Sequence, residues 1–104
     1  MKRNYAIVTG ASRGIGRYAA LALARSGCSI LAAARKDLQG LKSLQKEITE
    51  TYGQECLLFL GDAGSEKSIL SLFQQLPTDA SLKVLVNNAG ISHIGLLQDM
   101  SFDQ

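Results

Sequence analysis

The sequence predicts an α/β fold in which a parallel β-sheet lies between two layers of helices. Short runs of consecutive apolar residues alternate with longer segments whose apolar residues recur at helical spacing. Most of these runs end at a glycine or an asparagine, and the connections are short. Such an alternation favours a three-layer arrangement with right-handed crossovers. We expect the strand order 3-2-1-4, which is one half of a doubly wound sheet.

The first strand is expected over residues 5–9, where successive apolar residues indicate burial on both faces. A helix follows over residues 15–25 and ends at Ser26-Gly27. Its expected inward face consists of Ile15, Ala19, Ala22 and Leu23. Residues 29–34 form the second expected strand, although their alanines also suit a helix.

Asp37 is a suitable N-cap for a second helix, which should run to about Tyr52 and end at Gly53. The third strand is expected over residues 55–60. The apolar stripe of the second helix is Leu38, Leu41, Leu44 and Ile48.

Ser65 caps the expected third helix, and Pro77 ends it. Its inward residues should be Ile69, Leu72, Phe73 and Leu76. A fourth strand over residues 82–86 is expected to be an open edge of the sheet, and Ser101 is expected to cap another helix.

Composition limits the classes of function. The chain has 104 residues, of which 46% are hydrophobic and 19% charged, so a packed domain is favoured over disorder. A net charge of +2 without a block of Lys and Arg argues against a nucleic-acid-binding face. The apolar stretch of residues 19–34 is cut by Arg25-Ser26-Gly27 and cannot span a bilayer. We expect a soluble, cytoplasmic protein.

Both cysteines, Cys28 and Cys56, lie among apolar neighbours at expected strand starts. We predict buried, reduced thiols in preference to a disulfide or part of a metal site. With a single histidine in the chain, no structural metal is expected.

A glycine-rich segment, Thr9-Gly10-Ala11-Ser12-Arg13-Gly14-Ile15-Gly16, joins the first strand to the first helix. Gly10 permits a sharp turn, Gly14 leaves room for a pyrophosphate, and Gly16 lets the helix pack on the strand. The Gly-x-x-x-Gly-x-Gly spacing differs from the commonest dinucleotide fingerprint, and the segment is not a P-loop because Arg17 follows it. A phosphate site is predicted, with a turn that binds nothing as the alternative.

This segment, together with Asn87-Asn88-Ala89-Gly90 after the fourth strand, resembles the N-terminal half of the short-chain dehydrogenase/reductase family. Asp62-Ala63 is a weaker third match, and the resemblance extends from Tyr5 to about Gln104. It implies a Rossmann-type fold in which residues 1–104 form the cofactor-binding half-domain, and the catalytic half lies beyond them.

The resemblance also implies roles for individual residues. Residues 10–15 would hold the pyrophosphate and the adenosine ribose, Asp62 would accept from the adenine amino group, and Ala63 would pack on the ring. Residues 88–90 would line the ribose side. Asp62 could instead be a simple turn former, and Asn87 or Asn88 could tie strand ends together. The implied cofactor-binding residues are Gly10, Ser12, Arg13, Gly14, Ile15, Gly16, Arg35, Asp62, Ala63, Asn87, Asn88, Ala89 and Gly90.

The residues after the second strand point to NADP(H) as the cofactor. An NAD site of this kind needs a carboxylate there, but the sequence has no acid before Asp37. Arg35 follows that strand, and Arg13 approaches from the glycine-rich segment, so both guanidinium groups could pair with a 2′-phosphate. Lys36 either assists or points to solvent. The alternative for each arginine is an ordinary surface charge.

The resemblance implies a parent enzyme that reduces a carbonyl or oxidises an alcohol, and residues 87–91 are nearest to the 3-oxoacyl-thioester reductases. It further implies a homodimer or homotetramer. Family chemistry uses a Ser and a Tyr-x-x-x-Lys pair, and none of the three tyrosines here has Lys four positions later. We therefore assign no catalytic residue. His93 is expected in a loop, where it could act as a catalytic base, line the substrate side of the pocket wall or be a surface residue.

Two other functions stay open at this point. A non-catalytic NADP(H)-binding module or sensor would account for the same motifs. A nucleotide-free, flavodoxin-like signalling domain would explain neither the glycines nor the paired arginines.

Overall fold

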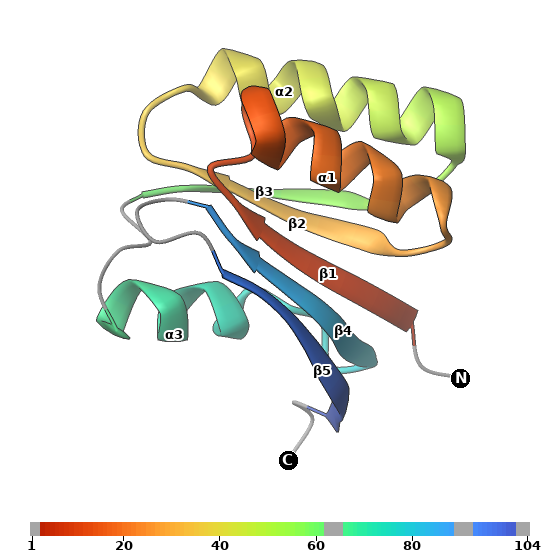
Figure 1. The fold of residues 1–104 in the computed structure, drawn as a ribbon, viewed down its shortest axis with the longest axis vertical. Helices are drawn as coiled ribbons and strands as arrows, with labels where there is room; N and C mark the ends of the chain where they lie inside the picture. The colour runs from red at the N-terminus through yellow and green to blue at the C-terminus, as the bar shows by residue number, and fades with distance from the viewer. Residues whose placement is uncertain (1–2, 62–65, 89–92, 102–104) are drawn as a thin grey trace.

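The computed structural model describes residues 3–61, 66–88 and 93–101, which form a three-layer α/β sandwich (Figure 1). A five-stranded sheet has the order β3-β2-β1-β4-β5. The first four strands in the chain are parallel, which confirms the predicted order 3-2-1-4. The strands are β1 (Arg3–Thr9), β2 (Ser29–Ala34), β3 (Cys56–Leu60), β4 (Ala80–Asn87) and β5 (His93–Ser101).

Helices cover both faces of the sheet. On one face lie α1 (Gly14–Arg25) and α2 (Leu38–Glu47), and α3 (Glu66–Gln74) lies on the other (Figure 1). A π-helical turn, η1 (Ile48–Tyr52), extends α2. It ends at Gly53, whose φ of 67° places the residue in the left-handed region that favours glycine. The predicted end of the second helix is thus confirmed.

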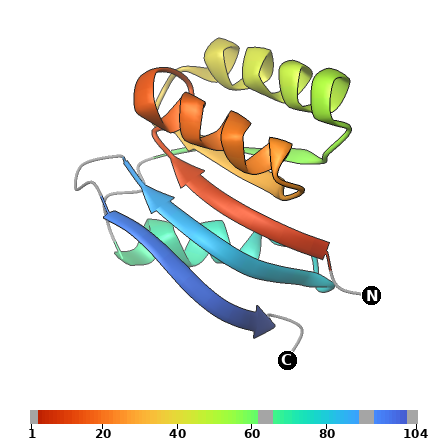
Figure 2. The same cartoon turned by 45° about the vertical axis from the view of Figure 1, so that its right-hand side comes forward.

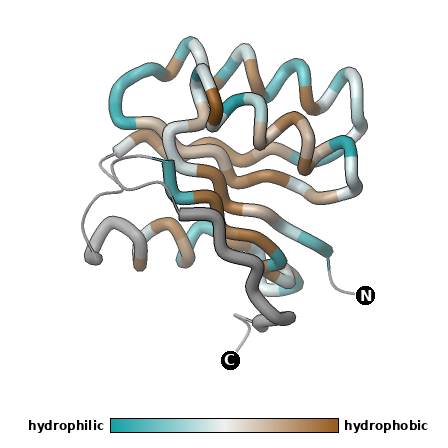
Figure 3. The backbone as a smooth tube through the Cα atoms, viewed as in Figure 1, coloured by the Kyte–Doolittle hydropathy of each residue, from teal (hydrophilic) through white to brown (hydrophobic). Residues whose placement is uncertain are grey.

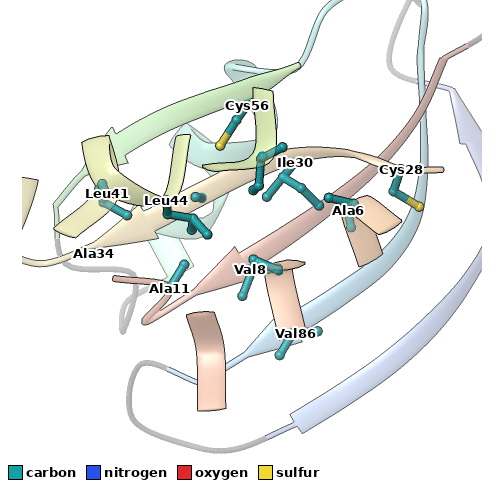
Figure 4. Packing of buried hydrophobic residues seen from close by; sticks show 14 residues of the cluster. Ala6, Val8, Ala11, Cys28, Ile30, Ala34, Leu41, Leu44, Cys56 and Val86 are labelled. Atoms are coloured by element: carbon teal, nitrogen blue, oxygen red, sulfur yellow. The ribbon is translucent and has the colours of Figure 1, made fainter. Parts of the chain in front are cut away.

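The core has two layers because β1 and β2 are buried on both faces. Ala6 and Val8 pack with Leu41 and Leu44 under α1 and α2 (Figure 4). Tyr5 and Ile7 pack on the opposite face, in a cluster with residues of the α3 layer. Burial on both faces explains why the middle of these strands consists of consecutive apolar residues, which appear brown in the middle of Figure 3.

The predicted inward face of the first helix is wrong for Ile15 and Ala22, which are exposed, whereas Ala19 and Leu23 pack against the core. Ile15 is 75% exposed, and the residues that α1 buries are Gly16, Ala20 and Ala24. These three small residues recur every fourth position and let the helix axis approach the sheet closely. Close approach, and not the size of the apolar side chain, therefore decides which face of α1 is inward.

The C-terminal part of the chain also differs from the prediction. β5 pairs antiparallel with β4, so β4 is an inner strand, and Ser101 is the last residue of β5 (Figure 2). Without β5, the outer edge of β4 would carry unpaired backbone N–H and C=O groups, and β5 provides their partners. His93, expected in a loop, is the first residue of β5.

Both cysteines are buried free thiols, as predicted. Burial raises the pKa of the Cys56 thiol to about 12. Within the described ranges, every helix is too short or too polar to cross a membrane.

Candidate functional site

The loop between β1 and α1 has a backbone that depends on glycine. Gly10 and Gly14 have φ values of 62° and 66°. A Cβ atom on Gly14 would meet nothing within 4 Å, so the space beside that residue is open. At Gly16, by contrast, a Cβ atom would lie 2.0 Å from the carbonyl oxygen of Gly10. The loop therefore closes on the first turn of α1 only because residue 16 has no side chain.

The carboxyl ends of β1 and β4 are joined through the hydroxyl group of Thr9. This hydroxyl accepts the backbone N–H of Asn88 at 2.8 Å and donates to Oδ1 of Asn87 at 3.0 Å. A Cβ atom on Gly10 would lie 3.0 Å from the carbonyl oxygen of Asn88, so the two strand ends are in close contact. Sequence reasoning missed Thr9, although a hydroxyl at the end of a buried strand is a usable signal.

The N-termini of α1 and α2 differ in how they are capped. Arg13 occupies the N-cap position of α1, and its side chain makes no capping hydrogen bond. In α2, the Asp37 carboxylate accepts the backbone N–H of Gly40 at 2.9 Å. The first-turn N–H groups of α1 lie beside the open space at Gly14, in the arrangement that binds phosphate groups in proteins.

A hollow of about 360 Å³ separates the glycine loop from the carboxyl end of β2. Arg13 contributes to it from the loop, and Arg35 and Lys36 from the segment after β2. Lys36, which could have pointed to solvent, is thus at the hollow. The lining residues are Gly10, Ser12, Arg13, Ala33, Ala34, Arg35, Lys36, Asp37 and Gly61.

Arg13 and Arg35, which line this hollow, differ from Arg3 and Arg17 in their ion pairs. Arg3 forms ion pairs with Glu55 and Asp79, and Arg17 pairs with Glu47. In the part of the chain that the structure describes, neither Arg13 nor Arg35 forms such a pair. Both residues are exposed, and an anion that entered the hollow would gain two partners that form no ion pair with a carboxylate of the described residues.

Arg17 fixes the start of α2 beside the glycine loop. Its guanidinium donates to the carbonyl oxygen of Gly40 at 3.2 Å and to Oγ of Ser43 at 3.2 Å, in addition to the contact with Glu47. These bonds join α1 to three successive turns of α2. The distance between the two walls of the hollow is therefore set in part by a side chain that does not line it.

Four of the predicted site residues, Asp62, Ala63, Ala89 and Gly90, lie outside the described residues. Gly61, which directly precedes Asp62, lines the hollow, and its N–H donates to the carbonyl oxygen of Ala34. The other predicted residues fall into two groups: those at the loop and hollow, and the pair Asn87-Asn88 at the end of β4.

Residues 4–104 match the sequence profile of the family described as short chain dehydrogenase. The chain belongs to this family. Solved structures of reductases match the fold of this chain, which contains the parallel strand order 3-2-1-4. One of them is the L-sorbose reductase from Gluconobacter frateurii, whose structure was determined with NADPH and L-sorbose. It aligns with a TM-score of 0.72 at 25% identity, over 88% of this chain and 35% of the reductase.

Two relatives by sequence illustrate the range of short-chain dehydrogenases that this chain resembles. Dehydrogenase/reductase SDR family member 1 from Mus musculus is 38% identical over 86% of this chain and 28% of its own length. A very-long-chain 3-oxoacyl-CoA reductase from Eremothecium gossypii is 37% identical over 88% of this chain and 26% of its own. The chain thus spans about a quarter to a third of the proteins it matches.

Proposed function

We propose that the chain binds NADP(H) at the glycine loop and the adjoining hollow, as the cofactor-binding portion of a short-chain reductase of carbonyl compounds. The observation that carries the proposal is the pair of exposed guanidinium groups, Arg13 and Arg35, on the two sides of one hollow. A 2′-phosphate on the adenosine ribose is the feature that distinguishes NADP(H) from NAD(H), and paired arginines suit it.

The residues of the chain would divide the work of binding. Backbone N–H groups at the start of α1 would hold the pyrophosphate beside Gly14, where there is space for it. Arg13, Arg35 and Lys36 would neutralise the 2′-phosphate. The contact of Thr9 with Asn87 and Asn88 would keep the end of β4 next to the glycine loop.

When bound, the nicotinamide of NADPH supplies a hydride to the carbonyl carbon of the substrate. This chain would contribute orientation and charge to that reaction. The reductase proposal draws support from the L-sorbose and 3-oxoacyl-CoA reductases among the similar proteins. A binding module without turnover is the second candidate, because the same glycine loop and arginines would also serve cofactor binding alone.

Calorimetric titration of the chain with adenosine 2′,5′-bisphosphate and with 5′-AMP tests the cofactor assignment, because these ligands differ only in the 2′-phosphate. We expect tighter binding of the bisphosphate. Arg35→Asp should lower its affinity by about tenfold or more, because it removes a charge-assisted pair and adds a like charge. Affinity for 5′-AMP should change little.

Lys42→Asp is the matched control, since it makes the same change of charge at an exposed position of α2 away from the hollow. Unchanged affinity of Arg35→Asp for the bisphosphate would refute the NADP(H) assignment. Oxidation of NADPH by the intact parent protein with a panel of ketones, aldehydes and oxoacyl thioesters separates the two candidate functions. Binding without turnover would favour the module.

A further inference from the structure

Asp37 places a carboxylate at the same hollow as the three cations, which conflicts with a site for a phosphate. The structure lessens this conflict by engaging one oxygen of the carboxylate in the cap of α2. Its Oδ1 accepts the backbone N–H of Gly40 at 2.9 Å and so caps α2. The carboxylate is exposed and therefore free to rotate once that bond is lost.

The cap has an unusual backbone geometry. Asp37 has φ −86° and ψ 74°, whereas N-cap residues are commonly extended. As a result, the carboxylate lies over the position that a side chain of residue 40 would fill. A Cβ atom on Gly40 would lie 2.4 Å from Oδ2 of Asp37 and 2.9 Å from Cβ of Ser12. Only glycine at this position is compatible with the cap and with the contact to the loop.

A side chain at residue 40 could be accommodated by movement of Asp37 or by movement of α2 away from Ser12. The second route is opposed by Arg17, which donates to the carbonyl oxygen of Gly40 and pairs with Glu47. Rotation of the exposed Asp37 side chain is the less costly route. The carboxylate would then be released beside Arg13 and Arg35.

We infer that Gly40 is a positioning residue for cofactor choice: it holds the Asp37 carboxylate on the cap of α2 and thereby keeps the hollow positive for a 2′-phosphate. The inference rests on the proposed binding of NADP(H). A released carboxylate would repel a 2′-phosphate and could instead accept hydrogen bonds from the ribose hydroxyls of NAD(H). Gly40 thus acts through Asp37, without contact with the cofactor.

The test compares adenosine 2′,5′-bisphosphate with 5′-AMP by calorimetry in four chains: the natural chain, Gly40→Ala, Asp37→Asn and the double variant. The affinity ratio is the affinity for the bisphosphate divided by that for 5′-AMP. In Gly40→Ala this ratio should fall roughly tenfold, which is the effect of one like charge near a surface phosphate. The double variant should recover the ratio of the natural chain, because the released group is neutral. A purely structural effect of Gly40→Ala would persist in the double variant.

Gly27→Ala serves as the control for general destabilisation. It strains a residue with φ 110° that faces open space after the end of α1. It should lower the free energy of unfolding and leave the affinity ratio unchanged. An unchanged ratio in Gly40→Ala, or no recovery in the double variant, would overturn the inference. The proposed function would still stand in that case if the natural chain preferred the bisphosphate.

Asp37→Asn alone tests the same inference if Gly40→Ala does not fold. Because the carboxylate is engaged by the cap, its neutralisation should change the affinity ratio by less than about twofold, as for a screened charge. A larger rise in preference for the bisphosphate would show that Asp37 already acts on the hollow, and would overturn the inference. If the natural chain binds neither ligand, the proposed function itself fails.

Discussion

Thr9→Val should separate the hydrogen bonds at the end of β1 from its packing. The substitution keeps the shape of a side chain that is 1% exposed but removes the hydroxyl. That hydroxyl accepts the N–H of Asn88 and donates to Oδ1 of Asn87. Valine would leave both of these groups without their partner on β1.

The expected cost follows from those two bonds. A partly buried donor that loses its partner costs about 1–3 kcal/mol, and the amide oxygen of Asn87 can turn to water at a smaller cost. We therefore expect Thr9→Val to lower the free energy of unfolding by about 2 kcal/mol. Because the same bonds hold Asn88 beside Gly10, affinity for adenosine 2′,5′-bisphosphate should fall as well.

Urea unfolding followed by circular dichroism measures the stability change. Thr9→Ser is the matched control, since it keeps the hydroxyl and loses one methyl group, at a cost of about 1 kcal/mol. Valine should therefore be the more destabilising of the two, although it is the more apolar. A Thr9→Val chain as stable as the natural one would refute the idea that the hydroxyl joins β1 to β4.

Two further predictions concern groups away from the hollow. Because burial raises the pKa of Cys56 to about 12, a thiol reagent at about pH 8 should label it only as the chain unfolds, and immediate labelling would contradict its burial. The same shift means that the free energy of unfolding, followed in urea, should decline as pH rises from the ordinary thiol value of 9.0 towards about 12. The hydrogen bond from the Arg3 guanidinium lowers the pKa of Asp79. The pair therefore stabilises the folded chain above the ordinary aspartate pKa, and this stabilisation is lost as the pH falls through the lower native pKa. Asp79→Asn should reduce the acid dependence of the urea midpoint, and an identical acid profile would exclude the pair as a cause.

The order of the sheet could be predicted because local patterns determine it. Residues 5–9 and 29–34 are buried at every position and mostly apolar, as is typical of a strand covered on both faces. The glycine loop was recognisable for a similar reason, since its three glycines satisfy backbone requirements that can be read from spacing alone. Arg35 was recognisable because it follows the end of β2.

Other features depend on contacts that a sequence does not display. The inward face of α1 is defined by the approach of Gly16 to Gly10, which overrides the apolar character of Ile15. The pairing of β5 depends on an open edge of β4, a property of the assembled sheet and not of residues 93–101. Periodicity gives no information about either.

The segment after β2 shows why charge alone cannot predict cofactor choice. Arg35, Lys36 and Asp37 are consecutive, so a sequence places two cations and a carboxylate at the same point of the fold. All three residues line the hollow, and in our proposal the direction of the Asp37 carboxylate depends on its cap on α2 and on the absence of a side chain at Gly40. A relative with the same arginine but a larger residue at that helix position should therefore tolerate NAD(H) better, because its cap carboxylate would be displaced towards the ribose.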